Sequence, residues 1–191
     1  MSRMNIELKA RKERYHFVIR ILLFAFLMVF SYILMLTVSN STPLPCMLIP
    51  CAVCFAMREQ PMASAVYGMI CGLLLDSAYN MLPGLSAVIL MWTALMASLL
   101  VNNLLRKNVF NFMWIDAAAC FIHGGLHYIL YYYVWGYDSD GLILLHIFVP
   151  EFLVSNAAGI VLYILTGVIT RRFGAINEHY IEERSDDIVR E

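Results

Sequence analysis

Charged residues are scarce in this chain of 191 residues, and that scarcity excludes most soluble proteins. Only 14% of the residues are Asp, Glu, Lys or Arg, whereas 61% are hydrophobic. A typical soluble domain has about 25% charged and about 45–50% apolar residues. A single core of this size could not bury so many apolar side chains beneath a polar surface. Lipid must solvate the remainder, so the sequence predicts an integral membrane protein.

The chain also lacks an excess of charge of one sign. Its 13 basic and 14 acidic residues give a formal net charge of −1 at pH 7. Binding to nucleic-acid phosphates needs a dominant basic surface, so nucleic acid is not expected as a partner. The five cysteines, an odd number, all lie in apolar stretches. That placement is typical of small buried side chains and not of a disulfide framework.

The motifs of several common enzyme classes are absent as well. The sequence contains no Gly-x-Ser-x-Gly elbow, no phosphate-binding glycine-rich loop ending in Lys, and no His-Glu-x-x-His. Asp76 and Asp116 could act as a pair only at the same depth, and their positions in the sequence predict different depths. We therefore expect no enzymatic activity, no catalytic residues and no cofactor.

Long hydrophobic segments are what the sequence does contain. A helix needs about 20 apolar residues to cross about 30 Å of hydrocarbon, and six segments reach or approach that length. The second is short and carries three prolines (Pro43, Pro45 and Pro50), so it is the least regular. Pro150 is an alternative, later start for the sixth span, because Pro150 followed by Glu151 is typical of a first helical turn. The predicted spans are 17–38, 43–57, 62–79, 83–105, 109–135 and 143–170.

The basic residues lie at alternate connections between these spans. They precede the first span, with Arg20 at its edge, separate the second from the third and the fourth from the fifth, and follow the sixth. Because Lys and Arg are retained on the cytoplasmic side, both termini are predicted to be cytoplasmic. The predicted organisation is a basic cytoplasmic N-terminus (1–16), an all-α transmembrane domain of six helices (17–170) and a charged cytoplasmic tail (171–191).

Ionisable side chains inside a bilayer are costly, which makes each of them a candidate for function. Four polar side chains spaced 4, 3 and 4 residues apart share one face of the fifth predicted helix: Asp116, Cys120, His123 and His127. They could form a polar pocket in the bundle interior, a proton relay or a metal site. Alternatively, they could make hydrogen bonds between helices that fix the packing. We favour the packing role.

A metal site would need more ligands than two histidines. His123 and His127 have a spacing compatible with zinc, and Cys51 and Cys54 could add thiolates. No glutamate follows His123 as it does in zinc proteases, and the sequence does not place the second span beside the fifth. We therefore predict that the chain binds no metal.

Small residues recur at every fourth position of the third span: Ser64, Gly68, Gly72 and Asp76. Such a face lets two helix backbones approach closely where lipid provides no hydrophobic drive. It predicts a helix-contact face that either packs within the chain, which we favour, or accepts a partner's transmembrane helix. Ser155 and Gly159 on the sixth span are interpreted as packing residues in the same way.

Residues 68–85 carry a more specific pattern. A glycine-rich helix ends in Gly-Leu-x-x-Asp, and a short turn follows with Pro-Gly at the start of the next helix. This stretch resembles the signature region of the rod shape-determining protein MreD family, which it matches at five positions: Gly72, Leu73, Asp76, Pro83 and Gly84.

The resemblance implies a non-catalytic, multi-pass protein of the bacterial inner membrane. Members of this family bind MreC and act with MreB filaments and the lateral-wall peptidoglycan synthases to control cell shape. The family fold is similar to the six-helix substrate-binding (S) components of energy-coupling-factor vitamin transporters, and such a component is the alternative function. S components contact their energising partner through an Ala-x-x-x-Ala pair on the first helix. The first span here, from Arg20 to Val38, contains only one alanine, Ala25.

Overall fold

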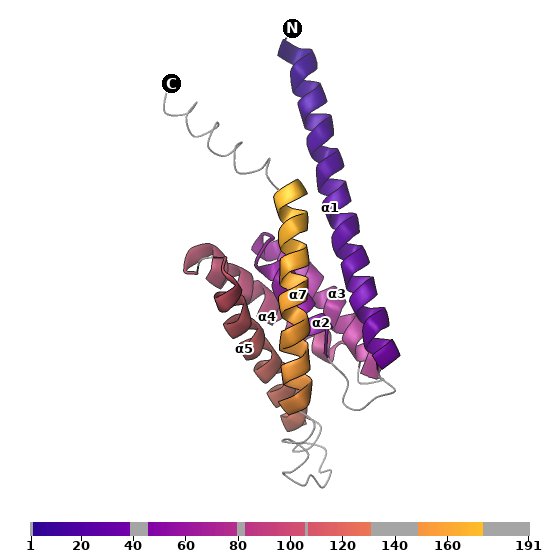
Figure 1. The fold of residues 1–191 in the computed structure, drawn as a ribbon, viewed down its shortest axis with the longest axis vertical. Helices are drawn as coiled ribbons and strands as arrows, with labels where there is room; N and C mark the ends of the chain where they lie inside the picture. Colours follow the sequence, from indigo (N-terminus) through magenta and orange to yellow (C-terminus); the bar gives the residue numbers. More distant parts are fainter. Residues whose placement is uncertain (1, 39–45, 80–82, 106, 131–148, 174–191) are drawn as a thin grey trace. The chain divides into compact units, whose positions relative to one another are not determined.

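The computed structural model describes residues 2–38, 46–79, 83–105, 107–130 and 149–173. The predicted all-α fold class is confirmed for these ranges, which contain helices and no strands. The connections predicted around 39–42 and 136–141, and the tail beyond residue 173, lie outside the described residues. The helices are α1 (Ser2–Val38), α2 (Leu48–Ala56), α3 (Pro61–Tyr79), α4 (Leu85–Asn103), α5 (Val109–Tyr128) and α7 (Val149–Phe173), as Figure 1 shows.

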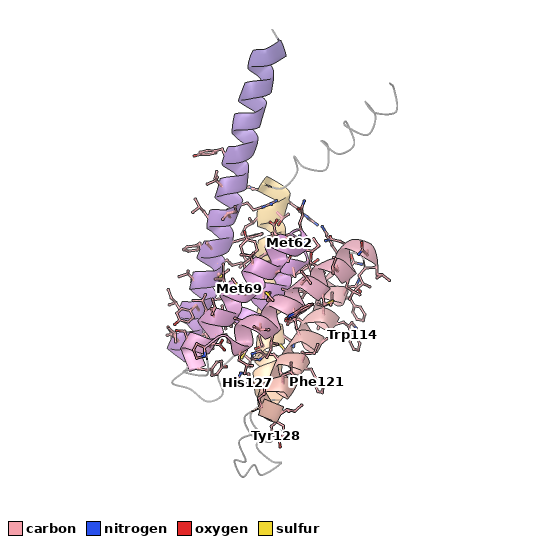
Figure 2. The ribbon with its side chains drawn as sticks, turned by 180° about the vertical axis from the view of Figure 1, so that it is seen from behind. Met62, Met69, Trp114, Phe121, His127 and Tyr128 are labelled. Carbon is pink, nitrogen blue, oxygen red and sulfur yellow. The ribbon has the colours of Figure 1, made fainter. Side chains whose placement is uncertain are left out.

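Five of the described helices are long and apolar enough to cross a membrane: Val18–Thr37 within α1, all of α3, α4 and α5, and Phe152–Arg172 within α7. Only 28–44% of the residues in these segments are buried by protein. Large apolar side chains remain uncovered, among them Met62, Trp114 and Phe121, which are 79%, 65% and 69% exposed (Figure 2). An apolar surface of this extent needs lipid around it, so the chain is a multi-pass membrane protein.

The second predicted span, 43–57, does not form a full crossing within the described residues. α2 contains nine residues, or about 14 Å at 1.5 Å per residue, whereas the hydrocarbon layer is about 30 Å thick. Pro50 lies in the first turn of α2, where a missing N–H group costs little. Every residue of α2 is buried, so it is a short helix enclosed by protein. Six complete crossings, and the side of the membrane on which the termini lie, stay predictions.

The described helices divide into two structural units. The terminal unit contains Met1–Leu27 and Leu165–Glu191, and the central unit contains Met28–Ile164. In the terminal unit, the Thr170 hydroxyl donates to the Thr166 carbonyl oxygen at 2.8 Å, which satisfies this polar group within α7. All the candidate site residues belong to the central unit.

Helix α2 lies at the centre of the central unit, in contact with α3, α4 and α5. Small side chains allow these helices to approach closely, as in the buried cluster of Ala56, Ala94 and Ala97. The most extensive contact is between α3 and α4. Helix α5 lies beside the first half of α7 (Figure 1), where the ring centroids of Phe112 and Tyr163 are 4.9 Å apart.

Two of the connections that carry basic residues lie at one end of the central unit. The Arg58 side chain donates to the Tyr163 carbonyl oxygen at 3.2 Å, and its guanidinium carbon lies 4.7 Å from the centroid of the Tyr163 ring. The Ser98 hydroxyl donates to the Glu59 carbonyl oxygen at 3.0 Å. Because the Tyr163 ring also contacts Phe112 in the first turn of α5, the α2–α3 and α4–α5 turns share this end.

Candidate functional site

The small-residue face of α3 packs against α4. A Cβ atom built on Gly68 would lie 2.5 Å from the Leu90 carbonyl oxygen. One built on Gly72 would lie 2.5 Å from both the Ala87 nitrogen and the Ser86 carbonyl oxygen. Only glycine lets the two backbones come this close. Helix α4 therefore occupies the face, and a partner's transmembrane helix could dock there only by displacing α4.

Asp76, the last residue of this face, caps α4 from the neighbouring helix. One carboxylate oxygen accepts a hydrogen bond from the Gly84 N–H at 2.7 Å, and the other accepts one from the Ser86 N–H at 3.1 Å. These N–H groups belong to the first turn of α4 and have no partner within that helix. The negative charge also meets the positive end of the α4 dipole. Asp76 thus fixes where α4 begins.

Gly84 lies in the turn directly before α4. Its φ angle is 101°, a left-handed conformation that residues with a side chain rarely adopt. Gly84 is also the N-cap residue of α4 and has no side chain of its own to cap the helix. The Asp76 carboxylate supplies the missing acceptor. The turn therefore needs both residues together.

Three further residues of the predicted face and motif have simpler surroundings. Ser64 is buried, and its hydroxyl donates to the Gln60 carbonyl oxygen at 3.0 Å at the start of α3. Pro83 is exposed and directly precedes the turn. Leu73 is 47% exposed on α3. Much of the Leu73 side chain is therefore accessible from outside the bundle.

The two histidines of α5 meet the start of α4 at Ser86. The His123 Nε2 atom lies 3.1 Å from the Ser86 hydroxyl, and the His127 Nε2 atom lies 3.5 Å from the same oxygen. The centroids of the two imidazole rings are 5.0 Å apart. A hydroxyl can donate to one ring nitrogen and accept from the other. Since Ser86 also donates its N–H to Asp76, one residue joins α3, α4 and α5 through hydrogen bonds.

Asp116 lies apart from this network. Its side chain is fully buried, and a Cβ atom built on Gly159 of α7 would lie 3.2 Å from its Oδ2 atom. Cys120, between Asp116 and the histidines along the helix, is 5% exposed. The four polar residues of α5 therefore line one face as predicted from their spacing, but the structure divides them between two surroundings.

The thiols of α2 and α3 have contacts other than those of the histidines. The Cys51 thiol of α2 and the Cys71 thiol of α3 neighbour each other, and the Cys54 thiol lies 3.9 Å from the Gly159 carbonyl oxygen. In the part of the chain that the structure describes, no group of three or more His, Cys, Asp or Glu side chains is arranged to hold a metal ion.

The thiols give the first testable prediction. None of the five cysteines is in a disulfide, and each is no more than 6% exposed. Because a maleimide reacts only with an accessible thiolate, we expect no labelling of the folded protein in mild detergent and labelling of all five after denaturation. A Leu104→Cys variant is the positive control, since Leu104 is 78% exposed at the end of α4. Rapid labelling of Cys51 or Cys54 in the folded protein would show that α2 is not enclosed.

Ser86 is the central residue that sequence reasoning missed. A signal was present, because a serine in the first turn of a helix often bonds to nearby backbone or side-chain groups. Its position two residues after Gly84 also places it directly beside the motif turn. Its contact with the histidines had no local signal, since that contact depends on α5 packing against α4.

The α3–α4 turn and the Ser86 network have the most specific geometry in the described part of the chain. No family model, curated protein or solved structure matches this chain. The function of the site is therefore inferred from its own residues.

Proposed function

We propose that this chain is an MreD-like, non-catalytic scaffold of the bacterial cell-elongation complex in the inner membrane. The observation that carries the proposal is that the motif residues work as one structural unit. Gly72 sets the α3–α4 contact, Asp76 caps α4, and Gly84 lies in the turn directly before α4. The motif residues stabilise a helical hairpin. Such a structural role is expected in a protein that functions by presenting a fixed surface to its partners.

The proposed partner is an MreC-like membrane protein. MreB filaments and lateral-wall peptidoglycan synthases are further partners, which bind the chain directly or through other proteins of the complex. The MreC-like protein must bind outside the α3 face that α4 already covers. Leu73 is the motif residue best placed for this contact, because its side chain is 47% exposed on α3. A partner helix would pack against such a surface through van der Waals contacts. The basic N-terminal residues favour contact with anionic lipid.

The test is affinity purification of the tagged chain from its native membrane in mild detergent, followed by mass spectrometry. We expect MreC and wall synthases in the purified complex. Leu73→Ala should reduce MreC recovery several-fold without changing the melting temperature of the chain. Val88→Ala is the matched control, since Val88 is an aliphatic residue of α4 that is 54% exposed and outside the motif. Equal loss with both variants would remove Leu73 from the contact, and absence of MreC from every preparation would refute the proposal.

The alternative function is the S component of an energy-coupling-factor vitamin transporter. It is favoured by one observation, the polar cluster of Ser86, His123 and His127 within the bundle, which could hydrogen-bond a polar ligand. The same purification separates the two functions. Recovery of ATP-binding cassette subunits with a membrane coupling protein would establish the transporter, and vitamin binding would then be measured with His123→Ala.

A further inference from the structure

Asp116 is a carboxyl group enclosed where α2, α5 and α7 meet. Its exposed fraction is 0%. A Cβ atom built on Gly159 would lie 2.8 Å from the Pro50 Cβ atom and 3.1 Å from the Phe112 Cζ atom. The same point lies 3.2 Å from the Asp116 Oδ2 atom. The missing side chain at Gly159 therefore makes room for the carboxyl group among apolar neighbours.

Neither oxygen of this carboxyl group has a hydrogen-bond partner among the described residues. The Ser155 hydroxyl, one turn before Gly159 on the same face of α7, is 1% exposed and has no such partner either. Asp76 is the useful contrast, because both of its oxygens accept hydrogen bonds from backbone N–H groups. The two aspartates thus have opposite surroundings, and only Asp76 has donors suited to a negative charge.

No described side chain supplies a positive charge to Asp116. Thiols and phenols carry no positive charge whether protonated or not, and the His123 ring is engaged with Ser86. The Arg58 guanidinium donates to the Tyr163 carbonyl oxygen and lies over the Tyr163 ring instead. The titratable or charged side chains on or beside these helices are Cys51 and Cys54 of α2, Arg58 and Glu59 after it, Lys107 before α5, Cys120, His123, His127 and Tyr128 of α5, and Glu151, Tyr163, Arg171 and Arg172 of α7.

We propose that Asp116 is a proton-binding site in the interior of the bundle, and that the packing of α7 on α5 at Gly159 depends on the bound proton. An ionised carboxylate without a partner is far more costly to bury than the neutral acid. The proton is the ligand that removes this cost without needing more space. Its release would leave a bare carboxylate against Phe112 and Gly159, so the contact between the two helices would loosen.

The surroundings select a proton over a metal ion. Alkali and alkaline-earth cations need several oxygen ligands around them, and no group of three or more His, Cys, Asp or Glu side chains is arranged to hold a metal ion among the described residues. The Ser155 hydroxyl is a neutral oxygen and would be a single additional ligand. A proton needs only one carboxylate oxygen. This site is independent of the proposed scaffold function and of its partners.

The experiment is infrared spectroscopy of the purified full chain in lipid vesicles, without sodium, as the pH is raised through neutrality. A protonated carboxylic acid has a carbonyl stretching band that a carboxylate lacks. We expect such a band at neutral pH in the natural chain and in Asp76→Asn, and its absence in Asp116→Asn. The band should be lost reversibly at alkaline pH.

A thermal measurement tests the coupling to packing. If the folded chain holds a proton that the unfolded chain releases, stability falls as the pH rises. We expect the melting temperature of the natural chain to decrease with rising pH and that of Asp116→Asn, whose amide is always neutral, to decrease less. Ser155→Ala should retain the dependence of the natural chain.

Each other outcome overturns the proposal. If no carbonyl band distinguishes Asp116→Asn from the natural chain, Asp116 is ionised in the folded protein. If sodium at neutral pH abolishes the band, the site binds a metal cation in place of the proton. If the melting temperatures of the natural chain and Asp116→Asn change in parallel with pH, packing at Gly159 does not depend on the proton.

Discussion

Gly72→Ala should destabilise the folded chain by about 2–3 kcal/mol, the upper range for forcing a methyl group into a closely packed contact. The added Cβ atom would lie 2.5 Å from the Ala87 nitrogen and from the Ser86 carbonyl oxygen. These are backbone atoms, so no rotation of a side chain can relieve the overlap. Helix α4 must move away from α3, and the start of α4 lies at this contact. The measurement is the thermal unfolding midpoint in mild detergent.

Gly125→Ala is the matched control for this prediction. Gly125 also lies within a helix, but a Cβ atom built there meets no atom within 4 Å. Alanine is favoured over glycine in a helix by about 1 kcal/mol, so this variant should be as stable as the natural chain or slightly more stable. If the two variants have equal stability, the α3–α4 backbones are not in contact at Gly72.

The effect at Gly72 also changes how partner binding must be tested. If a partner's helix docked on the small-residue face of α3, a leucine at Gly68 or Gly72 would abolish partner capture and leave insertion intact. Since α4 occupies this face, such variants should lose partner capture because the hairpin itself is disturbed. Partner binding is therefore better tested at Leu73, where the side chain is exposed on α3.

Asp76→Asn and Asp116→Asn should have different effects although the chemical change is the same. Asp76 accepts hydrogen bonds from the Gly84 and Ser86 N–H groups with its two oxygens, and an amide keeps only one acceptor oxygen. Hydrogen bonds to charged groups contribute about 1.5–3 kcal/mol, and helix caps about 1 kcal/mol. We therefore expect Asp76→Asn to destabilise the chain by about 2 kcal/mol, and Asp76→Ala by more.

Asp116→Asn should cause no comparable loss near neutral pH. The Asp116 carboxyl group makes no hydrogen bond with the described residues, so replacing it with an amide removes no hydrogen bond. The amide is also uncharged. Unfolding midpoints of the three variants, measured in one detergent at one pH, test this order. A loss at Asp116→Asn as large as that at Asp76→Asn would mean that Asp116 has a bonded partner of equal strength.

The transmembrane helices were predictable because they depend on local sequence. In lipid, a backbone must satisfy its hydrogen bonds within its own segment, so an apolar run of about 20 residues forms a helix whatever its neighbours are. The third, fourth and fifth predicted spans accordingly correspond to α3, α4 and α5 within a few residues at their starts. The spacing of Gly68, Gly72 and Asp76 likewise identified one face of α3.

The second span was not predictable in the same way. Its apolar composition indicated a crossing, but α2 is a nine-residue helix whose residues are all buried. A short helix is stable inside a bundle because neighbouring helices, and not its own length, shield it from lipid. That shielding is a property of α3, α4 and α5, with which α2 packs.

The sequence by itself determined that this is a helical membrane protein and which side chains are costly to bury. Only the tertiary structure decided how each cost is met. Asp76 accepts hydrogen bonds from the backbone of α4, and the histidines contact Ser86, whereas Asp116 lies against Gly159 with no donor among the described residues. Helix formation in lipid follows from local hydrogen bonds, but the partners of a buried polar group depend on which helices pack together and where along their axes they are in contact. That choice depends on residues far apart in the chain.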